Sequence, residues 1–500
     1  MSYLLLIPIL LPILGGLAMY FLRPGPNSEA YVSGSPLERR LRALVMTIVV
    51  LTSAAVWACI LLVGDEDANL FNFTNELQVV LRLDNLGRIF AGLVSVLWPI
   101  TTLYTLDYMA HDGHRWHFYP FFIASFGVTF GIAASGNLVT MYCFYELLTL
   151  VTLPLVLHPN THASNRAGRS YLAFSIGGAA FAFMGMVFLL PHGAQSEFAL
   201  GGILDASDAS WTRFVPVIFI FMFFGFGVKA ALFPLHVWLP KAAVAPTPVT
   251  ALLHAVAVVK AGAFAIIRLI YYVCGTDLLA GSWAQTVAIC VAAFTMLYGS
   301  TMALKQGHWK RRLAYSTVSN LSYIVFAASL MTPAGMAASL LHLLAHAFIK
   351  ILAFFCAGAV LHYTGREYID ELDGIGRKMP VTFACFAVSA LALTGIPLFN
   401  GFVSKWNILL AVPDAALTNP AAFIGGGALL ISAILTALYM ITTAVRAFFP
   451  SADFDAASLS GVREAGWRML VPMVILAAVI IITGLYATPF VNIAQTVAGI

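Results

Sequence analysis

The sequence predicts an all-α, polytopic membrane protein with about fourteen transmembrane helices. Hydrophobic residues make up 61% of the 500 residues and charged residues only 10%, whereas soluble domains carry about 25% charged residues. Apolar runs of about 20 residues, long enough to cross the hydrocarbon layer, recur along the chain. Several of these runs contain ionisable residues, although burying one in a bilayer costs roughly 2.5–3.5 kcal/mol.

The apolar runs are separated by short polar segments, which set the boundaries of the predicted spans. The first run is too long for the apolar core of a signal peptide and lacks a basic leader, so we expect it to be retained as a span. Residues 76–84 (ELQVVLRLD) alternate in polarity and predict a short strand pair. The predicted spans are 3–22, 43–63, 87–107, 116–134, 138–157, 169–190, 213–233, 248–273, 283–303, 312–330, 337–361, 380–411, 422–447 and 467–487.

The basic residues predict the orientation of the chain. With fourteen spans and both termini outside, eighteen of the 26 Lys and Arg residues fall in inward loops or at the adjoining span ends, three in outward loops or at the adjoining span ends, and five deeper within spans. Short cytoplasmic loops are enriched in Lys and Arg, so we expect both termini outside. The absence of a transit peptide favours the cytoplasmic membrane of a bacterial or archaeal cell.

Eight ionisable residues inside the predicted spans are the candidate functional residues. Such residues usually face the interior of a helix bundle and line a path for ions or protons. The first group, in spans five, seven and eight, is Glu146, Lys229, His254 and Lys260; the second, in spans eleven and twelve, is His342, His346, Lys350 and Lys405.

Two of these spans share a pattern that predicts an internal repeat. Pro234 follows Lys229 in span seven, and Pro397 precedes Lys405 in span twelve. Spans five apart cross the membrane in opposite directions, as in inverted repeats built around discontinuous helices. We therefore expect N-terminal helices 1–3 in residues 1–110, a first inverted five-helix repeat in 111–275, a second in 280–450 and helix 14 in 451–500.

Glu146 and Lys229 are the natural ion pair of the first group. A lone carboxylate in hydrocarbon becomes protonated, whereas a nearby lysine keeps it ionised. Lysine can lose its proton when buried, unlike arginine, so moving the carboxylate would switch the lysine between charged and neutral forms. Pro234 lacks an amide and leaves the carbonyl of Ala230 without its helical partner, which predicts a hydrated spot near Lys229. Two alternatives are that Glu146 is protonated and hydrogen-bonded within the helix bundle, and that the Lys229 side chain extends to the inner membrane interface.

The remaining candidates are arranged along two helices. His254 and Lys260 are six residues apart and point to different sides of a regular helix, so both line one path only if that path crosses the helix; His254 alone is also typical of a structural histidine. Histidines at 342 and 346 share one helix face with Lys350 and can relay protons near neutral pH. A zinc site at the two histidines is disfavoured because no acidic or thiol ligand accompanies them.

Lys405 follows the break GIPLFNG and is expected to be the terminal exchanger on the outward side. Ser316, Ser319 and Ser322 recur every three residues in span ten, and they either hydrate the centre or pack helices together. Arg268, near the outer end of span eight, is expected to reach the interface or to anchor a loop.

Other classes of site are disfavoured. The six cysteines form no CxxC pair and are expected to be packed thiols, five or six of them buried. No GxGxxG follows a strand, and no quinone, flavin or nucleotide site is evident. The basic residues are spread over short loops, which argues against a nucleic-acid partner. We expect no cofactor and no metal.

Four segments carry a resemblance to a known superfamily: NLVTMYCFYELLTL, KAALFPLHVWLPKAAVAPTPVTALLHAVAVVKAG, HLLAHAFIKILAFFCAG and GIPLFNGFVSKW. Over residues 80–450 the chain resembles the antiporter-like subunits of respiratory complex I, Mrp antiporters and membrane-bound hydrogenases. The resemblance implies fourteen helices with two inverted repeats and proton transfer along a central polar axis. By motif position it also implies that all eight candidates belong to this axis. A lysine at 405 is unlike the complex I member with glutamate there, and the chain ends soon after span fourteen. Both observations favour an Mrp D-type or hydrogenase-type subunit.

The expected function is proton or cation/proton translocation by a subunit of a multisubunit membrane complex. The expected partners are other membrane subunits and the lipid bilayer, and the transported ion is the proton, with sodium as the second candidate. No redox centre is evident, so the chain would at most be one subunit of a redox-driven translocase. The alternative is a stand-alone secondary cation/proton antiporter. A purely structural scaffold would leave the buried charges unexplained.

Overall fold

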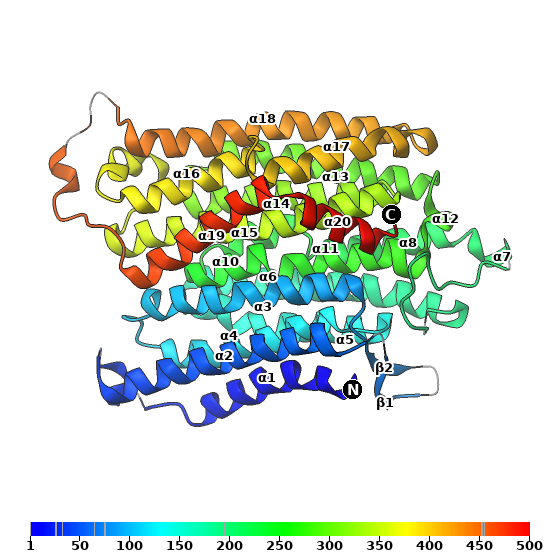
Figure 1. The fold of residues 1–500 in the computed structure, drawn as a ribbon, viewed down its shortest axis with the longest axis horizontal. Coiled ribbons are helices and arrows are strands. Elements are labelled where there is room, and N and C mark those ends of the chain that lie inside the picture. Colours follow the sequence, from blue (N-terminus) through cyan, green and yellow to red (C-terminus); the bar gives the residue numbers. More distant parts are fainter. Residues whose placement is uncertain are drawn as a thin grey trace.

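The chain forms one bundle of helices that lie roughly parallel (Figure 1). The computed structural model describes residues 2–25, 28–32, 34–64, 66–74, 77–194, 196–207, 209–451, 454 and 456–500. Within these residues, ten helical segments are long and apolar enough to cross a membrane. They contain α1 (Leu6–Phe21), α2 (Pro36–Leu62), α3 (Asn85–Tyr108), α5 (Leu138–Leu157), α6 (His162–Leu189), α10 and α11 (Thr247–Ala255 and Val258–Arg268), α13 (Trp283–Lys305), α15 (Pro333–Thr364), α18 (Ala421–Phe448) and α19 (Trp467–Leu485).

The four other predicted spans are also helical, although they are shorter, interrupted or more polar. Each of the fourteen predicted segments therefore contains helix, and the prediction of an all-α polytopic membrane protein is confirmed. The elements in these four spans are α4 (Arg115–Ala133), α8 (Val215–Gly227), α14 (Trp309–Ser329), and α16 with α17 (Pro380–Thr394 and Asn400–Thr418). The remaining short helices are α7 (Ala209–Thr212), α9 (Trp238–Ala242), α12 (Thr276–Leu279) and α20 (Thr488–Ala498).

The two strands pair in an antiparallel hairpin at one end of the bundle. Strands β1 (Ala68–Asn72) and β2 (Gln78–Leu81) align Ala68 with Leu81 and Asn72 with Gln78. The predicted strand segment, 76–84, covers β2, and its first residue, Glu76, lies outside the described residues. Both chain termini lie at this end, which we call the hairpin end (Figure 1).

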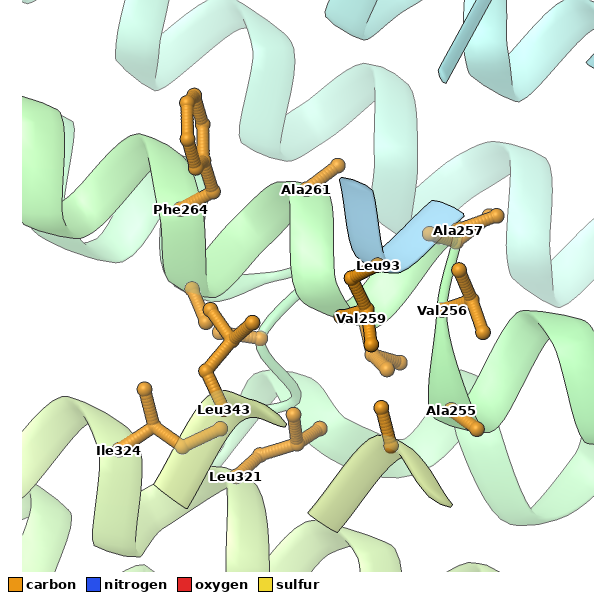
Figure 2. Close-up of a cluster of buried hydrophobic side chains, with 14 of the residues drawn as sticks. Leu93, Ala255, Val256, Ala257, Val259, Ala261, Phe264, Leu321, Ile324 and Leu343 are labelled. Carbon is orange, nitrogen blue, oxygen red and sulfur yellow. The ribbon is translucent and has the colours of Figure 1, made fainter. Parts of the chain in front are cut away.

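Span eight is interrupted, although its sequence predicts one continuous helix. α10 ends at Ala255 and α11 begins at Val258. The interrupting residues Val256 and Ala257 are surrounded by apolar side chains such as Leu93 (Figure 2). Neither residue is proline or glycine, so no local sequence signal explains the break. The break places the start of α11 in the interior of the bundle. The first amides of a helix have no partner within that helix.

Spans seven and twelve are interrupted as predicted, but the first break begins earlier than Pro234 suggests. α8 ends at Gly227, and Ala231 adopts a left-handed backbone conformation with φ of 56°. Lys229 therefore lies in the turn that follows α8, although the amide of Ala230 still donates to the carbonyl of Phe226 at 3.3 Å. In span twelve the break lies between Thr394 and Asn400. The division into repeats at 111–275 and 280–450 stays a prediction.

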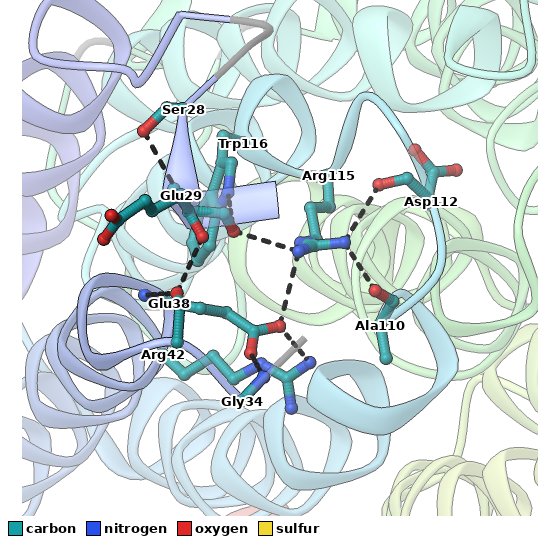
Figure 3. Close-up of polar contacts among 11 residues, drawn as sticks. Ser28, Glu29, Gly34, Glu38, Arg42, Ala110, Asp112, Arg115 and Trp116 are labelled. Carbon is teal, nitrogen blue, oxygen red and sulfur yellow. Dashed lines mark hydrogen bonds and ion pairs between the residues drawn. The ribbon is translucent and has the colours of Figure 1, made fainter. Parts of the chain in front are cut away.

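The end opposite the hairpin is held together by a buried ionic network (Figure 3). Glu38, at the first turn of α2, accepts hydrogen bonds from Arg42 at 2.6 Å and from Arg115 at 3.3 Å. Arg115 also donates to the carbonyl of Ala30 at 2.9 Å. Glu38 is 1% exposed and Arg115 3% exposed. A buried pair of this kind ties α2 to α4 because each charge is satisfied by the other.

Replacing Glu38 with alanine is expected to lower the unfolding free energy by about 3 kcal/mol, because two arginines lose their carboxylate partner. The thermal unfolding midpoint of the purified protein in detergent would measure the loss. The exposed Glu29, in the same region, is the control, and Glu29→Ala should leave the midpoint almost unchanged. Equal midpoints for the wild type and Glu38→Ala would contradict this account.

The cysteines depart in part from the prediction. Cys59, Cys274, Cys356 and Cys385 are buried free thiols, as expected. Cys143 and Cys290 are instead exposed, on α5 and α13. The expectation of five or six packed thiols is therefore wrong, because an apolar run does not reveal which face of a membrane helix points outward.

Candidate functional site

The eight predicted residues differ in burial. The four lysines and three histidines are all buried, with exposures of 0–5%. Glu146 differs from them because 26% of its side chain is exposed. Buried lysine side chains that lack strong counter-ions are costly, so their partners decide what the site can do.

Lys229 is held beside α5 by three contacts. Its Nζ lies 3.8 Å from Glu146 Oε1, so the predicted ion pair is present in the structure. The ammonium also donates a short hydrogen bond to the carbonyl of Tyr145 and lies 3.4 Å from the centre of the Tyr145 ring. Glu146 Oε1 has no hydrogen-bond partner among the described residues. The carboxylate is thus close enough to attract Lys229 but is not locked to it.

A glycine brings the two halves of the first group together. A Cβ on Gly262 would lie 2.4 Å from the amide nitrogen of Ala230 and 2.9 Å from Cβ of Lys229. Only glycine lets α11 pack this closely against the non-helical segment that carries Lys229. The predicted Lys260 lies two residues before this contact, on the same helix.

Lys260 and His346 form a direct contact between α11 and α15. Lys260 Nζ lies 2.9 Å from His346 Nδ1. Both groups are fully buried, and the other ring nitrogen of His346 has no partner among the described residues. Because one of these two groups must donate the hydrogen bond while the other accepts it, the pair holds at least one proton fewer than its full complement. A proton shared in this way can be passed on through the free nitrogen.

His342 and Lys405 continue the arrangement onto span twelve. His342 Nδ1 lies 2.9 Å from the hydroxyl of Ser404, the residue next to Lys405. Lys405 Nζ donates to the carbonyls of Leu393 at 2.6 Å and Thr394 at 3.1 Å. These are the last carbonyls of α16, and a cation there is favoured by the negative end of the helix dipole.

The structure does not place Lys350 and His254 in pairs with other candidates. Lys350 Nζ donates to the carbonyl of Leu313 on α14 at 3.2 Å. His254 packs against the ring of Phe354, with centroids 5.1 Å apart, and neither of its ring nitrogens has a partner among the described residues. The three candidates on α15 share one helix but contact three different neighbours, namely α17, α11 and α14.

Several buried polar atoms in this region have no hydrogen-bond partner among the described residues. Such atoms are usually satisfied by internal water. Together with the lysines they mark the polar part of the bundle interior. The atoms are both ring nitrogens of His254, Nε2 of His342 and His346, Oδ1 of Asn320 and Oε1 of Glu146.

Sequence reasoning missed Tyr323 and Ser432, whose hydroxyl groups lie beside this region. Tyr323 lies between Lys405, whose Nζ is 5.1 Å from its ring centre, and His342, whose ring is 5.2 Å away. Its hydroxyl donates to Ser432 at 2.8 Å. Of the serine triplet, Ser319 bonds to Ser432 at 2.9 Å. The hydroxyl groups of Ser316 and Ser322 bond to Tyr439 and to their own helix. The triplet thus joins α14 to α18, as helix-packing serines do.

Arg268 is an anchor, one of the two roles expected for it. It forms a two-bond ion pair with Asp84, in which Nη2 and Oδ1 lie 2.6 Å apart. Asp84 also caps α3 by accepting from the amide of Gly87 at 2.8 Å. This pair fixes α11 to the start of α3 at the hairpin end.

In the described part of the chain, no group of three or more His, Cys, Asp or Glu side chains could hold a metal ion.

The fold and the site define a multi-pass helical membrane protein whose interior holds lysines and histidines in contact with one another. The chain belongs to the family described as NADH:quinone oxidoreductase/Mrp antiporter, TM, whose model matches residues 135–449. This match covers every candidate residue.

Two relatives illustrate the family. The chain is 33% identical over 347 residues to the probable A/B subunit of a K(+)/H(+) antiporter from Rhizobium meliloti, an alignment that covers 69% of this chain. The chain spans about a third of that relative's length, since the alignment covers 34% of it. It is 32% identical over 388 residues to the N subunit of the NADH-quinone oxidoreductase from Desulforudis audaxviator, and this alignment covers 74% of each chain.

A solved structure has the same fold. One chain in the structure of the Mrp complex from Dietzia sp. superposes with a TM-score of 0.82 at 20% sequence identity, over 100% of this chain and 97% of that chain. At this identity the likeness concerns the fold alone.

Proposed function

We propose that this chain is a proton-translocating, or cation/proton-translocating, subunit of a multisubunit membrane complex. Protons move along a line of ionisable residues in the bundle, in the order Glu146, Lys229, Lys260, His346, His342 and Lys405. The Lys260–His346 contact of 2.9 Å carries this proposal. A buried lysine and a buried histidine joined by one hydrogen bond can exchange a proton, and two residues with purely structural roles would not require this pairing.

Switching of the first ion pair is energetically adequate for transport. Moving one elementary charge against 100 mV costs about 2.3 kcal/mol, and a shift of one pKa unit is worth about 1.4 kcal/mol. A movement of Glu146 that changed the proton affinity of Lys229 by about two pKa units would supply this amount. The 3.8 Å spacing leaves room for such a movement because the two side chains are not locked in a short hydrogen bond.

The exposure of Glu146 favours a role within a complex over a stand-alone antiporter. This carboxylate lies in the middle of α5, and 26% of its side chain faces outward. An ionisable group in contact with lipid is costly, whereas a neighbouring membrane protein that covers α5 would remove this cost. The names of the relatives, each a component of an antiporter or an oxidoreductase, agree with this reading.

The location of the complex is part of the same proposal. We place it in the cytoplasmic membrane of a cell, with the hairpin end and both termini outside, as the distribution of basic residues favours. The lysine at 405 favours an Mrp D-type or hydrogenase-type subunit. The proton is the transported ion, with sodium as the second candidate, and the energy comes from a partner subunit or from another ion gradient.

Replacing His346 with glutamine tests the proposed relay. We expect proton transport in vesicles carrying the assembled complex to fall at least about 100-fold, the scale of a lost proton-transfer group. Glutamine keeps a hydrogen bond to Lys260 but cannot take up the proton. Lys260→Ala should cause a similar loss, and the double variant should lose no more than either single variant, because the two residues act as a unit. Independent, multiplying losses would contradict a shared step.

Reconstitution distinguishes the two proposed forms of the protein. The purified chain is placed alone in liposomes, and ion exchange is followed with a pH-sensitive dye. A component of a larger complex is expected to be inactive until its partners are added. Robust exchange by the isolated chain would replace the proposal with the stand-alone antiporter.

A further inference from the structure

A cavity of about 550 Å³ lies on one side of the bundle, apart from the residues that form the proposed relay. It is bordered by α3, α15, α17 and α20. Most of its walls are apolar side chains, such as Leu93, Leu344 and Phe348. Trp57 and Ile493 also line it and are 44% and 51% exposed, so the cavity is open to the surroundings of the bundle.

Four polar side chains of the cavity lie toward its hairpin end, whereas Asn400, Ser404 and Thr483 line its inner part. Asn85 and Arg88 come from the first turn of α3, and Asn492 and Thr496 come from α20. Among the described residues that line the cavity, Arg88 is the one charged side chain. The cavity therefore combines a cationic, hydrogen-bonding mouth with an apolar body.

The cavity has the depth of one leaflet of a bilayer. Along α3 its lining runs from Asn85 to Val96, a distance of eleven residue steps or about 16 Å at 1.5 Å per residue. The hydrocarbon core of a bilayer is about 30 Å thick, so this length corresponds to about half of it. At its inner limit the cavity reaches Asn400, the first residue after the break in span twelve.

We propose that this cavity is a binding site for one anionic phospholipid of the leaflet at the hairpin end. The phosphate group binds at Arg88 and the amides of Asn85 and Asn492, and one acyl chain lies against Leu93, Leu344 and Phe348. Arginine suits phosphate because its planar guanidinium presents several donors. An amphiphile with a negative head and an apolar tail matches both the charge and the depth of the cavity.

The lipid would also close the bundle beside the relay. Ser404 lines the cavity and hydrogen-bonds to His342 at 2.9 Å. An acyl chain packed against Ser404 excludes water and ions that would otherwise reach His342 from the side. The bound lipid thus insulates the second half of the polar interior.

Lipid retention tests the site without reference to transport, so its outcome is independent of the proposed function. The purified chain is incubated in detergent with phosphatidylglycerol or with phosphatidylcholine, and bound lipid is counted by native mass spectrometry. We expect one molecule of phosphatidylglycerol to be retained after stringent washing, and phosphatidylcholine at least about tenfold less often.

Two variants locate the lipid. A Cβ on Gly92 would have no atom closer than 3.9 Å, so Gly92→Phe can place its ring in the cavity without a clash. This variant should lose the retained lipid at least about tenfold, and Arg88→Gln should lose the preference for phosphatidylglycerol. Gly177→Phe is the control, because Gly177, on α6, also has open space around it.

Three results would overturn the proposal: equal retention by wild type and Gly92→Phe, equal retention of the two lipids by the wild type, or a protein segment in the cavity. The variant Ala345→Cys detects such a protein segment, because Ala345 lines the cavity. Crosslinking of this cysteine to a copurified membrane protein would show that the cavity holds protein and not lipid.

Discussion

Lys229→Ala is expected to abolish proton transport, with a loss of at least about 100-fold, while the complex still assembles. The close approach of α11 to this segment involves the backbone and Cβ of Lys229, which alanine keeps. Among the described residues Lys229 is the only cation in ion-pair geometry with Glu146. Its removal leaves Glu146 free to become protonated and ends the switching of the pair. Transport is measured as proton uptake in vesicles, and assembly as copurification of partner subunits.

Lys229→Arg separates the charge of Lys229 from its ability to release a proton. Arginine remains protonated in proteins, so this variant keeps the ion pair but should be as inactive as Lys229→Ala. Lys241→Ala, at an exposed lysine twelve residues further on, is the matched control and should transport normally. Normal transport by Lys229→Arg would show that release of a proton from this position is not required.

The second large effect is expected at the hairpin end. Asp84→Ala should lower the unfolding free energy by about 3–5 kcal/mol, because it leaves Arg268, which is 1% exposed, without a counter-ion. The loss of the α3 cap adds about 1 kcal/mol. Chemical unfolding in detergent measures both, and Asp414→Ala, at an exposed position on α17, is the control. The double variant Asp84→Leu, Arg268→Met should recover much of the loss, since apolar residues often replace a buried ion pair without cost.

The same pair predicts a dependence on pH. Burial raises the pKa of Asp84, but the charge and hydrogen bonds of Arg268 and the amide of Gly87 outweigh burial and hold the pKa below its usual range. A lowered pKa in the folded state stabilises the protein above the unfolded pKa of about 3.9, and this contribution is lost as the pH falls through the folded pKa. The stability difference between the wild type and Asp84→Asn should therefore be constant from about pH 5 to 8 and shrink below about pH 4. A difference that shrank near neutral pH would point to another group.

Much of this architecture can be predicted from sequence because membrane spans obey a simple length rule. Each predicted span contains helix, and the breaks in spans seven and twelve are marked by Pro234 and Pro397. The break at Val256 and Ala257 could not be predicted, because no proline or glycine marks it.

The residues of the candidate site could be predicted from their types, but most of the contacts between them could not. Lysine and histidine inside apolar runs are visible in a sequence, and the pairing of Lys229 with Glu146 follows from there being so few partners. The contact of Lys260 with His346 joins residues 86 positions apart. The interruption of span eight also means that regular-helix geometry does not fix the angle between His254 and Lys260. Tyr323 and Ser404 carry no charge, so nothing in the sequence distinguished them from packing residues.

The carbonyl ligands of Lys405 make the two ends of the polar interior chemically unequal. Lys229 faces a carboxylate, which can itself take up a proton and so cancel its own attraction. Lys405 faces the peptide groups of Leu393 and Thr394, whose dipoles are permanent and cannot be titrated. The attraction of these two carbonyls for Lys405 can therefore change only if α16 and α17 move relative to each other. The carboxylate beside Lys229 can change by taking up a proton, whereas the carbonyl ligands of Lys405 can change only by moving.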